Sequence, residues 1–193
     1  MKQPSRNSVS RSRTEAAPKD RNQFPVRGVG PIDGIFHDDE EELRLLHHMA
    51  QEAEKYLEEI TRCKSVPEAY FGGGYGGVVA VFLFRVVPAT PGADEWLWVI
   101  VGDLPPACLA IERITTPSEA LEHYIWEMTR WVHFAKRGHL PENGIPINLE
   151  PTWKNAEELE DKLKILRKAV LPAFQANEAG KPLRHGRSRS SRA

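Results

Sequence analysis

The chain has 193 residues, of which 40% are hydrophobic, and a formal net charge of −1. This length favours one domain with a sizeable core. The longest apolar run, residues 78–84, is far shorter than the roughly 20 residues of a membrane-spanning helix, which excludes such a span.

The small net charge hides an uneven distribution. Residues 1–27 and 181–193 each carry +5, whereas residues 28–180 hold 14 Lys and Arg against 25 Asp and Glu, a net charge of −11. We therefore expect one acidic domain over residues 28–180. The two basic tails are too poor in large apolar side chains to fold and are expected to be disordered. The acidic charge argues against general nucleic-acid binding by the domain, because that binding needs Lys and Arg to neutralise phosphates.

A helix is the first predicted element, over residues 38–62. Apolar residues recur there at three- and four-residue steps, the period of one helical face. Its first turn is acidic, which suits the positive end of a helix dipole. The acidic residues form a candidate interaction surface and are Asp38, Asp39, Glu40, Glu41 and Glu42.

Three strands are expected next, over residues 78–87, 96–101 and 107–111. The first two have β-branched and aromatic residues on both alternating faces. Short connections favour an antiparallel meander of three to four strands. Because two apolar faces need two covers, either helices flank both faces of the sheet or a second subunit closes one of them. A homodimer is therefore one hypothesis.

Two helices follow the strands. Thr116-Pro117-Ser118-Glu119 offers an N-cap, a proline at the first helical position and a glutamate for a capping box, and this helix continues to about Lys136. After a proline-punctuated linker, a last helix is expected over residues 152–171, before Pro172 ends or kinks it. The order α-β-β-β-α-α, with three helices packed on the meander, predicts an α+β fold.

Residues 72–77, Gly-Gly-Gly-Tyr-Gly-Gly, contain the spacing G-x-G-x-x-G of dinucleotide-binding loops. Such a loop leads from a strand into a helix whose N-terminus meets the pyrophosphate, but here a strand follows. No G-K-[ST] loop or kinase signature accompanies it, and no cofactor is expected. We interpret the glycines as a bulged or closely approached stretch at the start of a strand, where side chains would clash.

Metal and thiol chemistry is not indicated. His47 and His48 are adjacent, hence about 100° apart on a helix, and neither has a partner at i+4 that would form a two-ligand face, so no metal site is expected. Cys63 and Cys108 match no metal or disulfide pattern, which favours inert free thiols in a reducing compartment. The polar N-terminus has no export signal, so we expect a cytoplasmic protein.

Three further residues are candidates for an interaction surface or a site. Asp103, in a Gly-Asp-Leu-Pro-Pro turn, could lie beside a groove formed with Trp98 and the helix from Thr116, although local turn hydrogen bonds also account for an aspartate there. Trp126 and Phe134 lie off the apolar stripe of that helix, where aromatic side chains can mark a contact surface.

The stretch WVIVGDLPPACL, residues 98–109, followed by TPSEALEHYIWEMTRWV from Thr116, resembles a bacterial family of small proteins with a domain of unknown function. The recurrent element of that family is a W-V-x-x-G-D-L-P strand and turn, followed by a P-x-x-A-L helix. The resemblance covers residues 70–136. It implies a bacterial, cytoplasmic α+β domain and brings no activity or catalytic residues.

These observations favour an acidic protein-binding module, immunity- or antitoxin-like, with a basic protein as its partner. One alternative is an enzyme of unknown reaction with a pocket near Asp103 and residues 72–77, although the lack of a catalytic motif leans against an enzyme. The other is a weak nucleic-acid contact through the basic tails.

Overall fold

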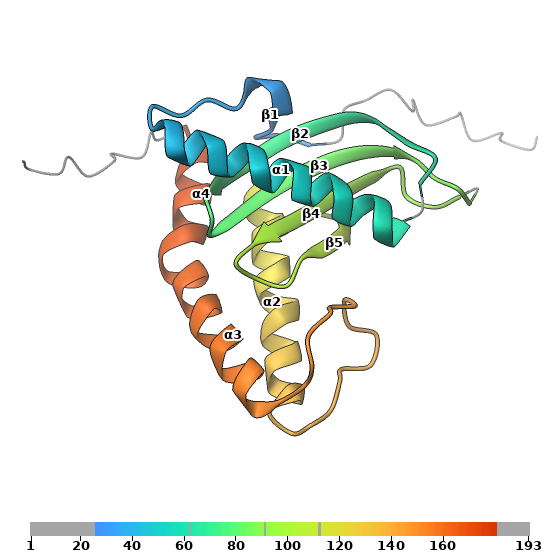
Figure 1. Ribbon diagram of the computed structural model, residues 1–193, viewed down its shortest axis with the longest axis vertical. Helices are drawn as coiled ribbons and strands as arrows, with labels where there is room; N and C mark the ends of the chain where they lie inside the picture. The colour runs from blue at the N-terminus through green and yellow to red at the C-terminus, as the bar shows by residue number, and fades with distance from the viewer. Residues whose placement is uncertain (1–25, 62, 91, 112, 181–193) are drawn as a thin grey trace, which may run out of the picture.

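The computed structural model (Figure 1) describes residues 26–61, 63–90, 92–111 and 113–180. The predicted tails lie outside these residues, except for Val26 and Arg27. Val26 is buried in the core, and the Arg27 N–H donates to the Thr115 carbonyl. The domain therefore begins at or before Val26, rather than at residue 28.

Within the described residues, five strands pair in chain order, each antiparallel to the next. They are β1 (Gly30–Pro31), β2 (Ser65–Tyr75), β3 (Val79–Val87), β4 (Trp96–Gly102) and β5 (Ala107–Ala110). The predicted antiparallel meander is confirmed, with more strands than the three to four expected. The sequence pattern misses β1 because it is so short, and β2 because proline and glycine interrupt it.

Alternate residues of β3 divide between two cores. Val79, Val81 and Leu83 belong to one apolar cluster, whereas Ala80 and Phe82 belong to a second cluster on the opposite face of the sheet. All of these side chains are completely buried. Both faces of this strand are therefore covered, as its unbroken apolar run predicts.

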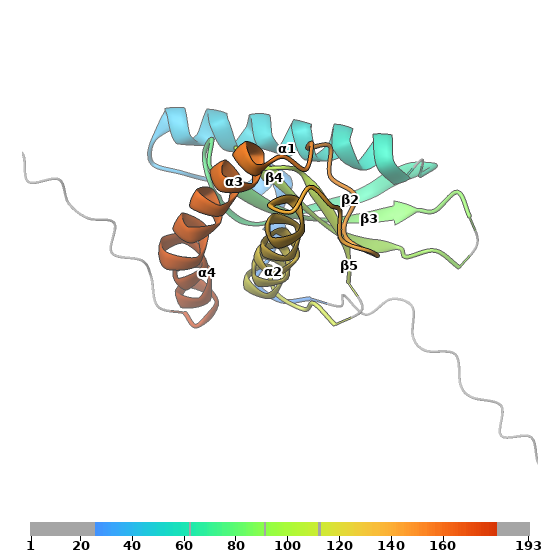
Figure 2. The same ribbon diagram turned by 90° about the horizontal axis from the view of Figure 1, so that it is seen from below.

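The helices cover both faces of the sheet (Figures 1 and 2). After the short 3₁₀ turn η1 (Ile32–Gly34), α1 (Glu40–Thr61) lies on one face and α2 (Pro117–Ala135) on the other. A long helical segment packs beside α2 and consists of α3 (Trp153–Ile165), η2 (Leu166–Val170) and α4 (Leu171–Glu178). Because one chain supplies both covers, the sheet does not need a second subunit to close it.

The start of α2 follows the predicted capping pattern. The Thr116 hydroxyl accepts a hydrogen bond from the Glu119 N–H, and Pro117 occupies the first turn. The Glu119 carboxylate reaches back to the N–H and hydroxyl of Thr115, one residue earlier than in a standard capping box. These hydrogen bonds lower the pKa of Glu119, the Thr115 N–H contributing most.

Pro172 does not end the last helix, which corrects the predicted boundary at residue 171. The helix passes through the π-helical segment η2 and continues as α4, with Pro172 in the first turn of α4. Proline lacks an N–H and crowds the carbonyl one turn before it. In a π turn the backbone hydrogen bonds join residues five apart and the turn is wider, which accommodates the carbonyl that loses its donor at the proline. The helix therefore continues past Pro172.

Candidate functional site

Residues 72–77, which we call the glycine segment, lie where three helices approach β2 and the turn after it. A Cβ atom added at Gly72 would lie 2.8 Å from Pro117 of α2, and one at Gly73 would lie 3.1 Å from Phe174 of α4. A Cβ at Gly76 would lie 2.8 Å from Glu42 of α1. The interpretation of a close approach is therefore confirmed, and an irregular register between Phe71 and Gly73 agrees with the expected bulge.

The position of the glycines differs in one respect from the prediction. Gly72, Gly73 and Gly74 are inside β2, rather than at the start of β3, and Gly76 and Gly77 form the turn between the two strands. A strand, β3, follows the turn, whereas a dinucleotide-binding loop leads directly into a helix.

A pocket of about 450 Å³ lies beside this glycine segment. It is formed by the start of α1 with the loop before it, the end of β2 and the end of α4. Its main apolar side chains are Phe36, Leu46, Phe71, Tyr75 and Phe174. Its polar side chains are His37, Glu42, Asn177 and Glu178. We call this space the glycine pocket.

Two carboxylates of the glycine pocket are held by hydrogen bonds from its walls. Glu42 accepts from the backbone N–H of Gly76, and Glu178 accepts from the N–H and the hydroxyl of Ser118. The Tyr75 phenol also lines the pocket, and burial, followed by the negative charge of Glu42, raises its pKa. The phenol therefore stays protonated at neutral pH, as a donor rather than an anion.

Asp103 lies in a different pocket, of about 310 Å³, between the β4–β5 turn and α3. Its carboxylate is 2.7 Å from the Lys162 amine, which also donates to the Asp103 carbonyl. Trp98 does not form a groove with it, because this side chain is completely buried and its N–H donates to the Ile114 carbonyl. The partner of Asp103 is thus α3, not the predicted Trp98 and α2, and Asp103 shares no pocket with the glycine segment.

Part of the predicted acidic cluster stabilises α1 and its neighbours. Asp39 accepts hydrogen bonds from the N–H groups of Glu41 and Glu42, as a helix cap does. Glu41 forms an ion pair with Arg44, whose hydrogen bond lowers the pKa of Glu41. Glu42 accepts a hydrogen bond from the Gly76 N–H in the turn between β2 and β3. Asp38 is exposed and precedes the first residue of α1.

The acidic surface continues along the outer side of α1, which the sequence reasoning missed because it considered only the first turn. We define the acidic face as eight exposed residues: Asp38, Asp39, Glu40, Glu41, Glu52, Glu54, Glu58 and Glu59. Arg44 and Lys55 are the exposed Lys and Arg residues of α1. Among the described residues, Glu41, Glu52 and Glu59 alone in this face have ion-pair partners.

The predicted aromatic candidates lie on α2, across the sheet from the acidic face. Trp126 is 54% exposed and Phe134 is 37% exposed. The guanidinium of Arg130 lies 5.5 Å from the centroid of the Trp126 ring, a cation–π contact, and the ring of His133 lies edge-on to Phe134. The predicted interaction residues are therefore distributed over opposite faces and do not form one surface.

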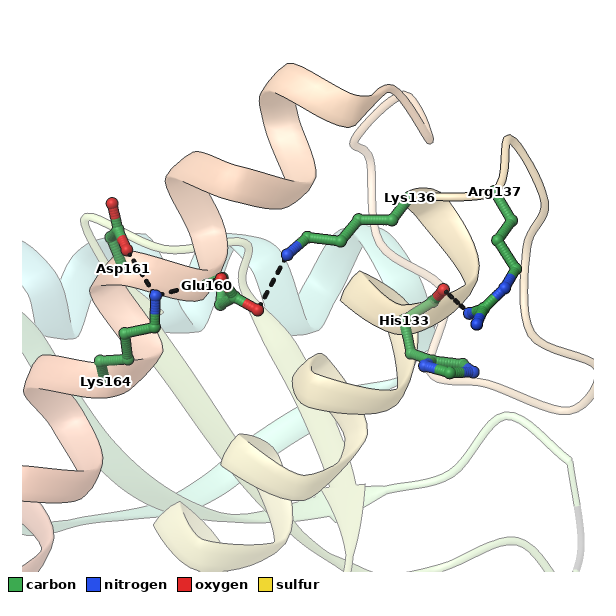
Figure 3. A network of polar contacts seen from close by, with 6 residues as sticks. All are labelled: His133, Lys136, Arg137, Glu160, Asp161 and Lys164. Carbon is green, nitrogen blue, oxygen red and sulfur yellow. Dashed lines mark hydrogen bonds and ion pairs between the residues drawn. The ribbon is translucent and has the colours of Figure 1, made fainter.

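The end of α2 is held against α3 by a charged network (Figure 3). Lys136 donates to Glu160 at 2.9 Å, and Lys164 bridges Glu160 and Asp161. The hydrogen bond from Lys136, followed by that from Lys164, lowers the pKa of Glu160. Every member is satisfied by a neighbour on the same two helices, so this network serves packing.

Thiols and metal ligands add no further site in the part of the chain that the structure describes. Cys63 and Cys108 are free, and burial raises the pKa of the Cys108 thiol to about 12. No group of three His, Cys, Asp or Glu side chains there could hold a metal ion. None of the described helices has both the length and the apolar character to cross a membrane.

Comparison with models of protein families, with curated proteins and with solved structures found no match to this chain. The resemblance of residues 98–109 to a bacterial family therefore stays a prediction.

Proposed function

We propose that this chain is a protein-binding module that recognises a basic protein through the acidic face of α1. The observation that carries the proposal is the arrangement of exposed carboxylates along the outer side of this helix, where Arg44 and Lys55 are the only Lys and Arg residues. A negative surface of this kind attracts a basic partner over long range and favours its orientation in the encounter complex.

The distribution of buried and exposed groups in α1 agrees with a binding role. Leu46, Met49, Ala53 and Leu57 are buried against the sheet, so the helix is anchored on its inner side. The outer side is then presented on a rigid element, which reduces the entropy that binding would cost. An immunity or antitoxin protein that neutralises a basic effector would use such a surface.

A solvated acidic surface that only maintains solubility would have the same net charge. The two interpretations differ in whether the position of the charges matters. The binding proposal requires carboxylates on α1, whereas solubility depends on total charge.

Two full-length variants separate these interpretations because they lose the same charge at different places. In the face variant, four glutamates of α1 become Gln: Glu52, Glu54, Glu58 and Glu59. In the control variant, four exposed glutamates elsewhere become Gln: Glu122, Glu142, Glu150 and Glu157.

Each protein is immobilised and exposed to a lysate of the native host, bound proteins are identified by mass spectrometry, and the best candidate is purified for kinetics. We expect one basic protein to bind the wild type and the control variant, with an association rate about tenfold lower for the face variant. The difference should shrink at high salt. Failure to recover a basic protein, or equal binding by both variants, would overturn the proposal.

A further inference from the structure

We propose that the glycine pocket binds a small organic cation, an amine or a guanidine that carries an aromatic or aliphatic group. This goes beyond the protein-binding role and does not depend on it. A volume of about 450 Å³ falls within the range of small-molecule sites, which is about 300–1,000 Å³.

The apolar part of the ligand is indicated by the aromatic side chains. Phe36, Phe71 and Phe174 all line the pocket. Phe36 is 80% exposed, the largest exposure among the described large apolar side chains. Burying this ring against an apolar ligand would remove it from water, and an aromatic ring can also accept a cation on its face.

The positive charge of the ligand is indicated by the polar side chains. Glu42 and Glu178 line the glycine pocket, and Asp38 and Asp39 line a second hollow that shares Phe36 and His37 with it. Among the described residues, no Lys or Arg lines either hollow. An anion would be repelled here, whereas an ammonium or guanidinium group would meet carboxylates.

The carboxylates of Glu42 and Glu178 still have acceptor positions for hydrogen bonds from a ligand. Glu42 uses one oxygen for the Gly76 N–H, and each oxygen of Glu178 accepts one hydrogen bond from Ser118. An ionised carboxylate has about four acceptor positions, so both residues can accept further hydrogen bonds from a cationic donor. The bonds already present hold the carboxylates in place, which lowers the cost of organising the site.

The edge of β2 adds backbone groups. β1 pairs with β2 at Tyr70 and Phe71, and within the described residues no strand pairs with the outer edge of Gly72, Gly73 or Gly74. Pro117, Phe174 and Ala80 fill the positions where Cβ atoms of these glycines would lie, so a ligand would meet the main chain at this outer edge.

The test is an NMR titration of the full-length protein, followed through the backbone amide signals of the glycine segment. The probes are phenethylamine and phenylacetate, which have similar size and opposite charge. We expect phenethylamine to shift the amide signals of Gly73 and Gly76, with a dissociation constant of about 1 mM. Phenylacetate should shift them little.

Three variants locate the binding. Glu42→Gln should weaken phenethylamine about tenfold, because a charge-assisted hydrogen bond is lost. Phe36→Ala should weaken it several-fold, and since this side chain is exposed, the variant keeps its fold. Glu52→Gln, on the same helix but outside the pocket, should bind like the wild type.

The same cation could also belong to a lysine side chain of a bound protein. The blocked dipeptide acetyl-Phe-Lys-amide distinguishes the two sources, because the proposal expects weaker binding of the dipeptide than of the free amine. Equal shifts with phenylacetate, no shift with phenethylamine, unchanged binding by Phe36→Ala, or tighter binding of the dipeptide would each overturn the proposal. The role of the acidic face is tested separately, since its variants leave the pocket intact.

Discussion

The carboxylate of Glu178, at the end of α4, accepts hydrogen bonds from the N–H and the hydroxyl of Ser118 at 2.7 and 2.6 Å. Ser118 is in the first turn of α2, where backbone N–H groups have no partner within the helix. A side chain that is 60 residues later in the chain thus caps this helix. Pro117, the residue before Ser118, lies against Gly72, which lines the glycine pocket.

Removing this cap should destabilise the protein. Glu178→Ala leaves the N–H of the buried Ser118 without its acceptor and removes a negative charge from the positive end of the helix dipole. We expect the free energy of unfolding to fall by about 1–2 kcal/mol. Urea denaturation measures it, with Glu157→Ala, an exposed residue of α3, as the control. Equal stability of the two variants would contradict the capping role.

Adding a side chain to the glycine segment should lower the free energy of unfolding where the new atoms would contact the backbone. A Cβ at Gly74 would lie 2.9 Å from the carbonyl oxygen of Val79, which is fixed in the sheet. Gly74→Ala should therefore reduce the free energy of unfolding by about 2 kcal/mol or more. Gly34→Ala is the matched control, because a Cβ there meets no atom within 4 Å. Thermal unfolding of both variants measures the difference. Equal destabilisation by the two substitutions would show that the backbone freedom of glycine, rather than close approach, explains Gly74.

The fold could be predicted from the sequence where the signal is local. The unbroken apolar run of β3 predicts a strand that is buried on both faces, and Thr116-Pro117-Ser118-Glu119 predicts the start of α2 within one residue. Both signals are local, because the pattern of a buried strand and the cap of a helix each depend on residues that are neighbours in the chain. The continuation past Pro172 could not be predicted, because a proline is compatible with either a helix end or a distorted turn.

The candidate sites could be predicted only in part, because residues far apart in the sequence build them. The glycine pocket joins Phe36 and Glu42 to residues 71–75 and to Glu178. Asp103 meets Lys162, which is 59 residues later in the chain. No spacing rule connects such residues. The exposed glutamates of α1 are the exception, because a helical projection of residues 38–62 would have placed them on one side.

The N-cap of α2 offers a second test of local stability. Thr116→Ala removes the hydroxyl that accepts from the Glu119 N–H and should lower the free energy of unfolding by about 1 kcal/mol. Thr90→Ala, an exposed residue of the β3–β4 turn, should change it by less than about 0.5 kcal/mol. If circular dichroism in urea gives the same midpoint for both variants, the hydroxyl contributes nothing to the helix.

Acid should weaken the link between α2 and α3. The pKa of Glu160 is lowered from 4.5 by Lys136 and Lys164, so its folded value lies below its unfolded value. Its contribution to stability is therefore present above about pH 4.5 and is lost as the pH falls through the folded pKa. Glu160→Gln should be less stable than the wild type at pH 7, and the difference should shrink towards pH 3. A difference that is constant across urea titrations in this range would exclude the ion pairs as its source.

The two thiols should differ in their response to unfolding. Because burial raises the pKa of Cys108 to about 12, its thiolate fraction at pH 8 is smaller than that of an ordinary thiol by about a thousandfold. In a Cys63→Ala variant, the remaining thiol should thus react with a disulfide reagent about a thousandfold more slowly in buffer than in denaturant. Rates that agree within a factor of about ten would show that the fold does not shield the Cys108 thiol, which is only partly buried.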